Sequence, residues 1–254
     1  MTRALIAILI LLGVGTAQAG LTRTELQGVA VSLQSGARID LSLTAHDVEG
    51  RRRSFNNWLG GKPALLVFVD YTCTSLCGSD LRLLAFAIES SGLRTDEYHL
   101  LVIGIDPKDP PEAAEKLASG QIPADISATT TLLLPDQDTV ERLAKAVGFS
   151  YLYDAAIDQF AHPAVAYVLR ADGAVVSALS PFETDPWSLA RIIREPFNRE
   201  TLTIPQRIRI LCYSLAAETG LYGPRIAAIL ETAAAGTVFL IVIGILFLVR
   251  RTRQ

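Results

Sequence analysis

The 254-residue sequence is poor in side chains that bind soft metals or form crosslinks, with one methionine, three histidines and three cysteines. The methionine is Met1, so no thioether is available to a site in the rest of the chain. Three cysteines allow at most one intramolecular disulfide, which makes a disulfide-stabilised scaffold a poor explanation for them. Acidic residues outnumber basic ones, 26 to 23, and no basic stripe occurs, so nucleic acid is not an expected partner.

Both ends of the chain carry apolar segments. Residues 1–19 contain one arginine, an uncharged stretch and Ala17-Gln18-Ala19, the small-x-small pattern of a signal-peptide cleavage site. Residues 233–249 are uncharged, and the tail 250–254 that follows contains three arginines. We predict a signal peptide, a single transmembrane helix and a cytoplasmic basic tail, which together place the domain between them outside the cytoplasm.

The region between the ends is long enough for one domain with a sizeable core. We expect an N-terminal extension over residues 20–38, an α/β domain over 39–196 and a juxtamembrane amphipathic segment over 197–232. In that segment Thr203 can cap a helix that ends at Gly220. Its apolar face would consist of Ile204, Ile208, Leu211 and Leu215.

Strands and helices alternate through the predicted domain. A hairpin with its turn at Glu49-Gly50 is followed by alternating units, and an Asp-Gly turn at Asp172-Gly173 joins two late strands. The predicted strands are 39–45, 51–53, 64–69, 100–105, 130–134, 164–169 and 174–179. The predicted helices are a short turn from Ser54 to Trp58, then 79–90, 111–119, 138–147 and 187–194. This succession indicates a thioredoxin-like fold with an N-terminal hairpin.

Cys73 and Cys77 follow the apolar strand and precede a helix, with Ser79 or Asp80 available as its cap. A thiol at a helix N-terminus is acidified by the unpaired backbone N–H groups there, and the thiolate is the reactive and metal-binding form. The residues alone leave several roles open: two ordinary buried cysteines, a crosslink, a redox couple, a nucleophile with its resolving partner, or two ligands of copper(I) or zinc. The three intervening residues favour a looser loop than the two of thioredoxin-type reductases.

A metal held by two thiolates needs a third ligand, and only three histidines are available. His46 lies in or beside the first hairpin and His99 opens a buried strand, so both are expected to be surface or packing residues. His162 stands in a predicted loop before strand 164–169. A thioredoxin-like sheet would place that strand next to the central one, which puts His162 within reach of the cysteines.

Four stretches in this order resemble the Sco/SenC family over about residues 39–195. They are Gly61-Lys62-Pro63, Tyr71-Thr72-Cys73-Thr74-Ser75-Leu76-Cys77, Gly104-Ile105-Asp106-Pro107, and His162 leading into Ala164-Val165-Ala166-Tyr167-Val168-Leu169. The resemblance implies a membrane-anchored, thioredoxin-like protein that binds copper through Cys73, Cys77 and His162. It also implies a chaperone in cytochrome c oxidase assembly. The predicted signal peptide and C-terminal anchor would locate this chaperone in the bacterial inner membrane, with its soluble domain in the periplasm. The implied partners are the oxidase's copper-binding subunit or another copper chaperone, and a thioredoxin-like reductant.

The chain departs from the family pattern at three places. Thr74 and Gly78 stand where the family usually has proline after each cysteine, so the loop is less constrained. The anchor is predicted at the C-terminal end, whereas it is usually N-terminal. Pro163 follows His162, which fixes the loop and permits a cis bond.

Other functions remain open on the sequence. A thiol-disulfide oxidoreductase would need Cys73 and Cys77 as a redox pair but not His162. A peroxiredoxin-like peroxidase would need a threonine and an arginine around the attacking thiolate; Thr72 is available, and no arginine is identified. A redox or copper sensor that signals through the membrane helix is a further alternative. Metal transfer needs no turnover chemistry, so enzymatic activity is left open.

The third thiol, Cys212, is interpreted as a small buried or lipid-facing residue, with an accessory role in copper or disulfide exchange as the alternative.

Overall fold

The computed structural model describes residues 21–73, 77–182, 184–195, 211–212 and 236–237. The chain divides into two units, 1–214 and 215–254, and every element named below belongs to the first. The predicted signal peptide, the basic tail and all but two residues of the predicted transmembrane helix lie outside the described residues. Of the helices that are described, none combines the length and apolarity needed to cross a bilayer.

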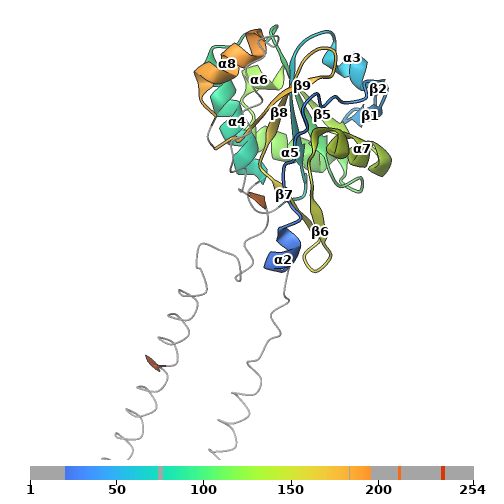
Figure 1. Ribbon diagram of the computed structural model, residues 1–254, viewed down its shortest axis with the longest axis vertical. Helices are drawn as coiled ribbons and strands as arrows, with labels where there is room; N and C mark the ends of the chain where they lie inside the picture. The colour runs from blue at the N-terminus through green and yellow to red at the C-terminus, as the bar shows by residue number, and fades with distance from the viewer. Residues whose placement is uncertain (1–20, 74–76, 183, 196–210, 213–235, 238–254) are drawn as a thin grey trace, which may run out of the picture. The chain divides into compact units, whose positions relative to one another are not determined.

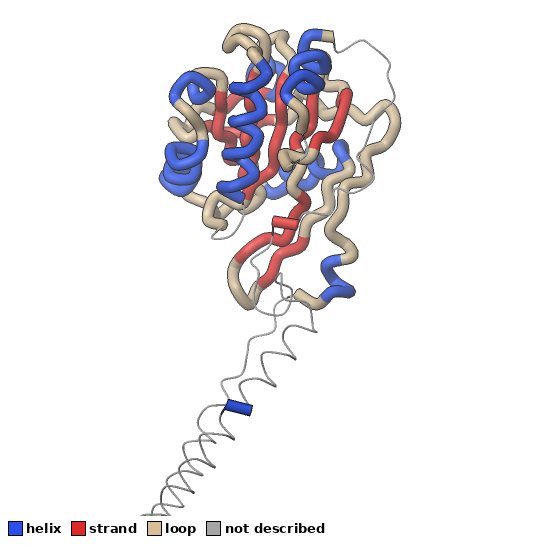
Figure 2. Tube along the Cα trace, turned by 90° about the vertical axis from the view of Figure 1, so that its left-hand side faces the viewer, coloured by secondary structure: helices blue, strands red, loops and turns tan. Residues whose placement is uncertain are grey.

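Seven strands form the central sheet (Figures 1 and 2). Their order is β2 (Arg52–Ser54), β1 (Thr44–Asp47), β5 (Thr130–Leu134), β4 (His99–Gly104), β3 (Ala64–Val69), β8 (Ala166–Leu169) and β9 (Val175–Leu179). The three central strands β5, β4 and β3 are parallel, and the pairs outside them are antiparallel. The mixed α/β sheet and the N-terminal β1–β2 hairpin are therefore as predicted.

Helices cover both faces of this sheet (Figure 1). One face packs against α3 (Phe55–Leu59) and α7 (Gln137–Val147). The other packs against α4 (Cys77–Ser91), α5 (Pro111–Gln121), α6 (Ala124–Ser127) and α8 (Pro186–Arg194). Every residue of β3 is buried, and alternate side chains enter the two cores, which explains its continuous apolar sequence.

A second, smaller sheet lies beyond one end of the central strands (Figures 1 and 2). It contains β6 (Leu152–Asp154), β7 (Gln159–Pro163) and β10 (Leu211–Cys212), and its apolar side packs with residues in and around α2 (Arg23–Leu26). The β6–β7 hairpin was not predicted, because its turn has Asp158 at φ 50° in place of an Asn-Gly or Asp-Gly pair. The prediction that His162 stands in a loop is thus wrong, since it lies within β7.

Two further local predictions are wrong. The predicted strand 39–45 begins only at Thr44, because Asp40 closes a turn in which its carboxylate accepts hydrogen bonds from the backbone and hydroxyl of Ser42. In the predicted helix from Thr203 to Gly220, Leu211 and Cys212 are extended and pair with β7. Pairing at this edge satisfies backbone groups of β7 that a helix would leave open. The rest of that segment lies outside the description.

Candidate metal centre

Cys73 lies after the end of β3, as the sequence predicts, whereas Cys77 is the first residue of α4 and does not precede it. Cys73 takes part in a disulfide bond, and the side chain of Cys77 lies outside the description. Helix α4 begins at Cys77 itself, two residues earlier than expected, so Asp80 occupies its first turn and does not cap it. The expected acidification of Cys77 by the helix N-terminus stays a prediction.

The start of the cysteine loop is held by two buried carboxylates. Asp70 Oδ1 accepts hydrogen bonds from the backbone N–H and the hydroxyl of Thr72, at 3.0 and 2.9 Å. Asp109 Oδ2, from the segment between β4 and α5, accepts one from the backbone N–H of Tyr71 at 2.9 Å. The backbone N–H of Cys73 donates to the carbonyl of Asp70 at 3.1 Å, which closes the turn. The backbone leading into Cys73 is therefore fixed by side chains and by its own turn.

Tyr71 anchors the same loop to the sheet. Its hydroxyl lies 2.8 Å from the carbonyl oxygen of Val102 and 3.2 Å from that of Leu133. Its ring lies so close to β4 that a Cβ on Gly104 would stand 2.7 Å from a ring carbon. Glycine is therefore required at the end of β4 for Tyr71 to reach this position.

Burial makes the two carboxylates unusually weak acids. Burial raises the pKa of Asp109 to about 6, and the neighbouring Asp70 carboxylate adds to the rise. Burial also raises the pKa of Asp70, against the opposing effect of its hydrogen bonds from Phe160 and Thr72. Neither residue was singled out from the sequence. A usable signal was present for Asp70, which directly follows six buried apolar residues and precedes Cys73 by three positions.

The third predicted ligand, His162, lies in β7 and is 1% exposed. Its ring is 6.0 Å from that of Phe149, and its Nδ1 is 3.2 Å from the carbonyl oxygen of Pro163. A carbonyl at Nδ1 favours the tautomer with the proton on that nitrogen. Burial lowers the pKa of His162 to about 4, so the ring is neutral at physiological pH. The peptide bond before Pro163 is trans.

Sheet topology brings the histidine and the cysteines to the same end of the fold. Strand β8 runs antiparallel to β3, with Ala166 opposite Val67, so the residues before β8 lie near those after β3. Two contacts confirm that the segments meet. The backbone N–H of Phe160 donates to Asp70 Oδ2 at 3.1 Å, and Gln159 Nε2 donates to the carbonyl of Thr72 at 3.3 Å.

The complete ligand set stays a prediction. In the part of the chain that the structure describes, which leaves out the side chain of Cys77, no three His, Cys, Asp or Glu side chains are grouped as a metal site. What the structure does bring together is the segment that leads to Cys73 and the strand that carries His162.

The two other histidines lie elsewhere, as expected. His46 is exposed on β1, with its Nδ1 3.4 Å from the carbonyl oxygen of Gly50. His99 is half-buried at the start of β4, opposite Ala64 at the start of β3. The cysteine loop follows the far end of β3, about 17 Å away along a six-residue strand.

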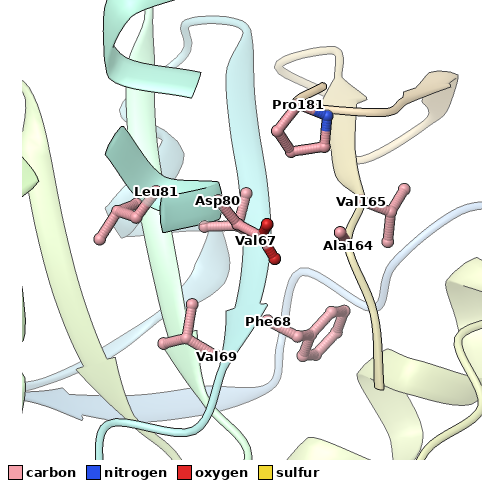
Figure 3. Close-up of a pocket in the computed structure, with 8 residues that line it drawn as sticks. All are labelled: Val67, Phe68, Val69, Asp80, Leu81, Ala164, Val165 and Pro181. Atoms are coloured by element: carbon pink, nitrogen blue, oxygen red, sulfur yellow. The ribbon is translucent and has the colours of Figure 1, made fainter. Parts of the chain in front are cut away.

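A small cavity adjoins the first turn of α4 (Figure 3). Its walls are mostly apolar and include Val67, Val165 and Pro181. Asp80, which is 8% exposed, points its carboxylate between β3 and the segment at Ala164 (Figure 3). The cavity thus holds a buried carboxylate one helical turn beyond Cys77, where the N-terminal end of the helix favours negative charge.

Known proteins resemble this chain in both sequence and fold. The family model of SCO1/SenC matches residues 32–197. A SCO1/SenC family lipoprotein from Bacillus anthracis str. Ames is 17% identical, with a TM-score of 0.55 and coverage of 65% of this chain and 98% of the other. Arabidopsis thaliana ScoI with copper bound is 19% identical, with a TM-score of 0.51 and coverage of 61% and 95%.

A third solved structure is BsSco, described as a member of the Sco family of cytochrome c oxidase assembly proteins with a disulfide switch. It is 16% identical, with a TM-score of 0.51 and coverage of 64% of this chain and 96% of the other. No curated protein matches the sequence. At these identities the solved structures establish a shared fold.

Proposed function

The chain belongs to the SCO1/SenC family, and from this premise we propose that it is a copper chaperone for the assembly of cytochrome c oxidase. Copper is its cargo, bound by the thiolates of Cys73 and Cys77 and the imidazole of His162. The observation that carries the proposal is the contact of the β7 segment, two and three residues before His162, with the loop that leads to Cys73. Solved relatives in this fold include one with copper bound and one named among cytochrome c oxidase assembly proteins.

The chemistry begins with reduction of the disulfide that contains Cys73. A thioredoxin-like reductant supplies two electrons through its own dithiol, which becomes a disulfide while the two cysteines of this chain become thiols. Copper(I) then displaces the thiol protons and is held by two soft thiolates and a neutral imidazole. His162 suits this role because its ring is neutral at physiological pH.

Delivery follows by ligand exchange. Thiolates of the oxidase's copper-binding subunit, or of another copper chaperone, replace those of Cys73 and Cys77 one at a time, with no net change in oxidation state. The predicted signal peptide and C-terminal anchor place this exchange at the periplasmic face of a bacterial inner membrane. A test of that location is protease accessibility of the domain in intact spheroplasts, where protection would contradict it.

Copper(I) titration of the reduced full-length chain against a chelator tests the proposal. We expect one copper(I) per chain and loss of tight binding in Cys73→Ser and Cys77→Ser. His162→Ala should weaken binding less, because both thiolates remain. His46→Ala is the matched control, since its ring is exposed on β1, outside the site. Unchanged affinity in the two cysteine variants would contradict the proposal.

A thiol-disulfide oxidoreductase is the second candidate, and the disulfide at Cys73 favours it specifically. Here Cys73 and Cys77 would reduce cysteines of a target protein and become oxidised in the same step. His162→Ala separates the two functions. If this variant loses copper(I) binding yet still supports oxidase assembly in cells, the redox role is the main one.

A further inference from the structure

Asp70 contacts both segments of the candidate site, the loop that leads to Cys73 and the strand β7 that carries His162. It lies just outside β3, so strand pairing in the central sheet does not explain why a buried carboxylate stands there. It directly follows β3, is 1% exposed, and precedes Cys73 by three positions. We propose that Asp70 is a positioning residue that sets the place of His162 relative to Cys73, an inference that rests on the proposed copper-binding function. Asp70 does not itself bind the metal in this proposal.

The two carboxylate oxygens of Asp70 serve different segments. Oδ1 accepts from the backbone N–H and hydroxyl of Thr72, which shapes the turn that leads to Cys73. Oδ2 accepts from the backbone N–H of Phe160, which is 90 positions away in sequence and two residues before His162. One rigid group of atoms therefore holds both halves of the site, and a shift of either oxygen moves the two segments relative to each other.

Two neighbouring contacts also link the β6–β7 hairpin to the segments around it. Gln159 Nε2 donates to the carbonyl of Thr72 at 3.3 Å, so it joins β7 to the cysteine loop as Asp70 does. Lys108 Nζ lies 5.2 Å from the ring centre of Tyr153 on β6, so the segment after β4 also touches the hairpin. The small sheet pairs with none of the seven central strands among the described residues. Besides the short chain connection from β7 to β8, such side-chain contacts hold it at the cysteine loop; Asp70 and Gln159 are both buried, and of the two only Asp70 accepts from backbone groups of both segments.

A neutral carboxamide distinguishes positioning from mere packing. Asp70→Asn keeps the size of the side chain and one acceptor oxygen, but places an NH2 group where one set of N–H donors now finds an acceptor. We expect copper(I) affinity to fall about 10-fold, as is typical when a residue that orients metal ligands is changed. Asp40→Asn is the matched control, because Asp40 Oδ1 accepts from the backbone and hydroxyl of Ser42 in the same pattern, on the exposed surface.

The test is a double-mutant cycle on the reduced full-length chain, with copper(I) affinity measured by chelator competition. If Asp70 acts through the placement of His162, Asp70→Asn should cost about 10-fold in the presence of His162 and little in the His162→Ala background. Hydrogen exchange of the Phe160 amide, measured without copper, should be faster in Asp70→Asn than in Asp40→Asn.

Each outcome decides something specific. Unchanged affinity in Asp70→Asn, or an equal loss in both backgrounds, would overturn the positioning role while leaving the proposed function intact. Unchanged exchange of the Phe160 amide would also overturn it, because the contact would then not hold the hairpin. Failure of the unsubstituted chain to bind copper(I) would instead overturn the proposed function, and the positioning role with it.

Discussion

Two hairpins of this molecule are held in different ways. The β8–β9 hairpin belongs to the central sheet, where β8 pairs with the central strand β3 along four registered positions. Its turn is secured at the surface, where Asp172 pairs with Arg170 and with Arg38. The β6–β7 hairpin belongs to the small sheet, and it meets the cysteine loop through the buried Asp70 and through Gln159.

The first kind of attachment bears mainly on the stability of the fold, and the second on the position of His162 relative to Cys73. A hairpin built into the sheet shares the backbone pairing and core packing of its neighbours, so exposed ion pairs at its turn add little. The β6–β7 hairpin pairs with no central strand among the described residues, so apart from its chain connections it meets the cysteine loop through side-chain contacts. The predicted ligand His162 lies on this second hairpin, so its position relative to Cys73 depends on these contacts and not on pairing within the central sheet.

The largest loss of stability is expected for Phe149→Ala. Phe149 is 4% exposed, stacks on Phe68 of β3 at 4.4 Å between ring centres, and lies 6.0 Å from the His162 ring. Truncation leaves a cavity between the central core and the β6–β7 hairpin, so the free energy of unfolding should fall by about 3–5 kcal/mol. Denaturant unfolding measures this. Trp187→Ala, at a residue that is 82% exposed, should change it by less than about 0.5 kcal/mol.

The stability of the protein should also depend on pH through His162, which lies on the β6–β7 hairpin, called here the site hairpin. The pKa of His162 is about 4 in the folded protein and 6.5 in an unperturbed ring, so between these values the unfolded chain binds more protons. The free energy of unfolding should therefore fall as pH drops from about 6.5 to about 4, by roughly 3 kcal/mol in total from this group. His162→Asn should remove that part of the pH dependence, and His46→Asn should leave it. Parallel curves for all three proteins would contradict the burial of a neutral ring.

The contribution of the β8–β9 turn to stability changes only at lower pH. Its hydrogen bond with Arg170 lowers the pKa of Asp172 below the usual 3.8, so its contribution is present above that value and is lost only in stronger acid. Between pH 6.5 and 4 this turn should thus contribute little to the acid response, whereas Asp109, whose pKa burial raises to about 6, contributes there in the direction opposite to His162.

A moderate effect is expected at Gly173 in the β8–β9 turn. Gly173 has φ 82°, and a Cβ there would lie 3.0 Å from the carbonyl oxygen of Ile39. Gly173→Ala should lower the free energy of unfolding by roughly 1–3 kcal/mol, through both backbone strain and the close contact. Gly36→Ala is the matched control, because Gly36 has φ 77° and open space around it, so only the strain applies. Equal losses in the two variants would show that the contact with Ile39 does not matter.

A smaller effect than at Gly173 is expected for Asp172→Ala. Side chains of Asp172 and Arg38 are 46% and 53% exposed, and pairs of this kind contribute about 0–1 kcal/mol because water and salt screen them. The unfolding free energy should therefore fall by less than about 1 kcal/mol, with copper(I) affinity unchanged. A loss of copper(I) affinity here would remove the proposed separation between the two hairpins.

Much of the fold could be predicted because its signals are local. The continuous apolar run of β3, the amphipathic pattern of α7 and the Asp-Gly turn between β8 and β9 each depend on neighbouring residues. The prediction was wrong where one side chain or a distant partner decides the backbone. Asp40 delays β1 by closing a turn, and β7 receives Leu211 and Cys212 as an added strand in place of a helix.

The sequence by itself determined that a buried strand precedes Cys73 and that a helix starts close to Cys77, because apolar periodicity and helix starts depend on residues within a few positions. Only the tertiary structure decided that β7, which carries His162, contacts the loop leading to Cys73 through Asp70 and Gln159. The physical reason is that the Asp70 carboxylate accepts from the backbone N–H of a residue 90 positions away, and no local pattern encodes such a partner.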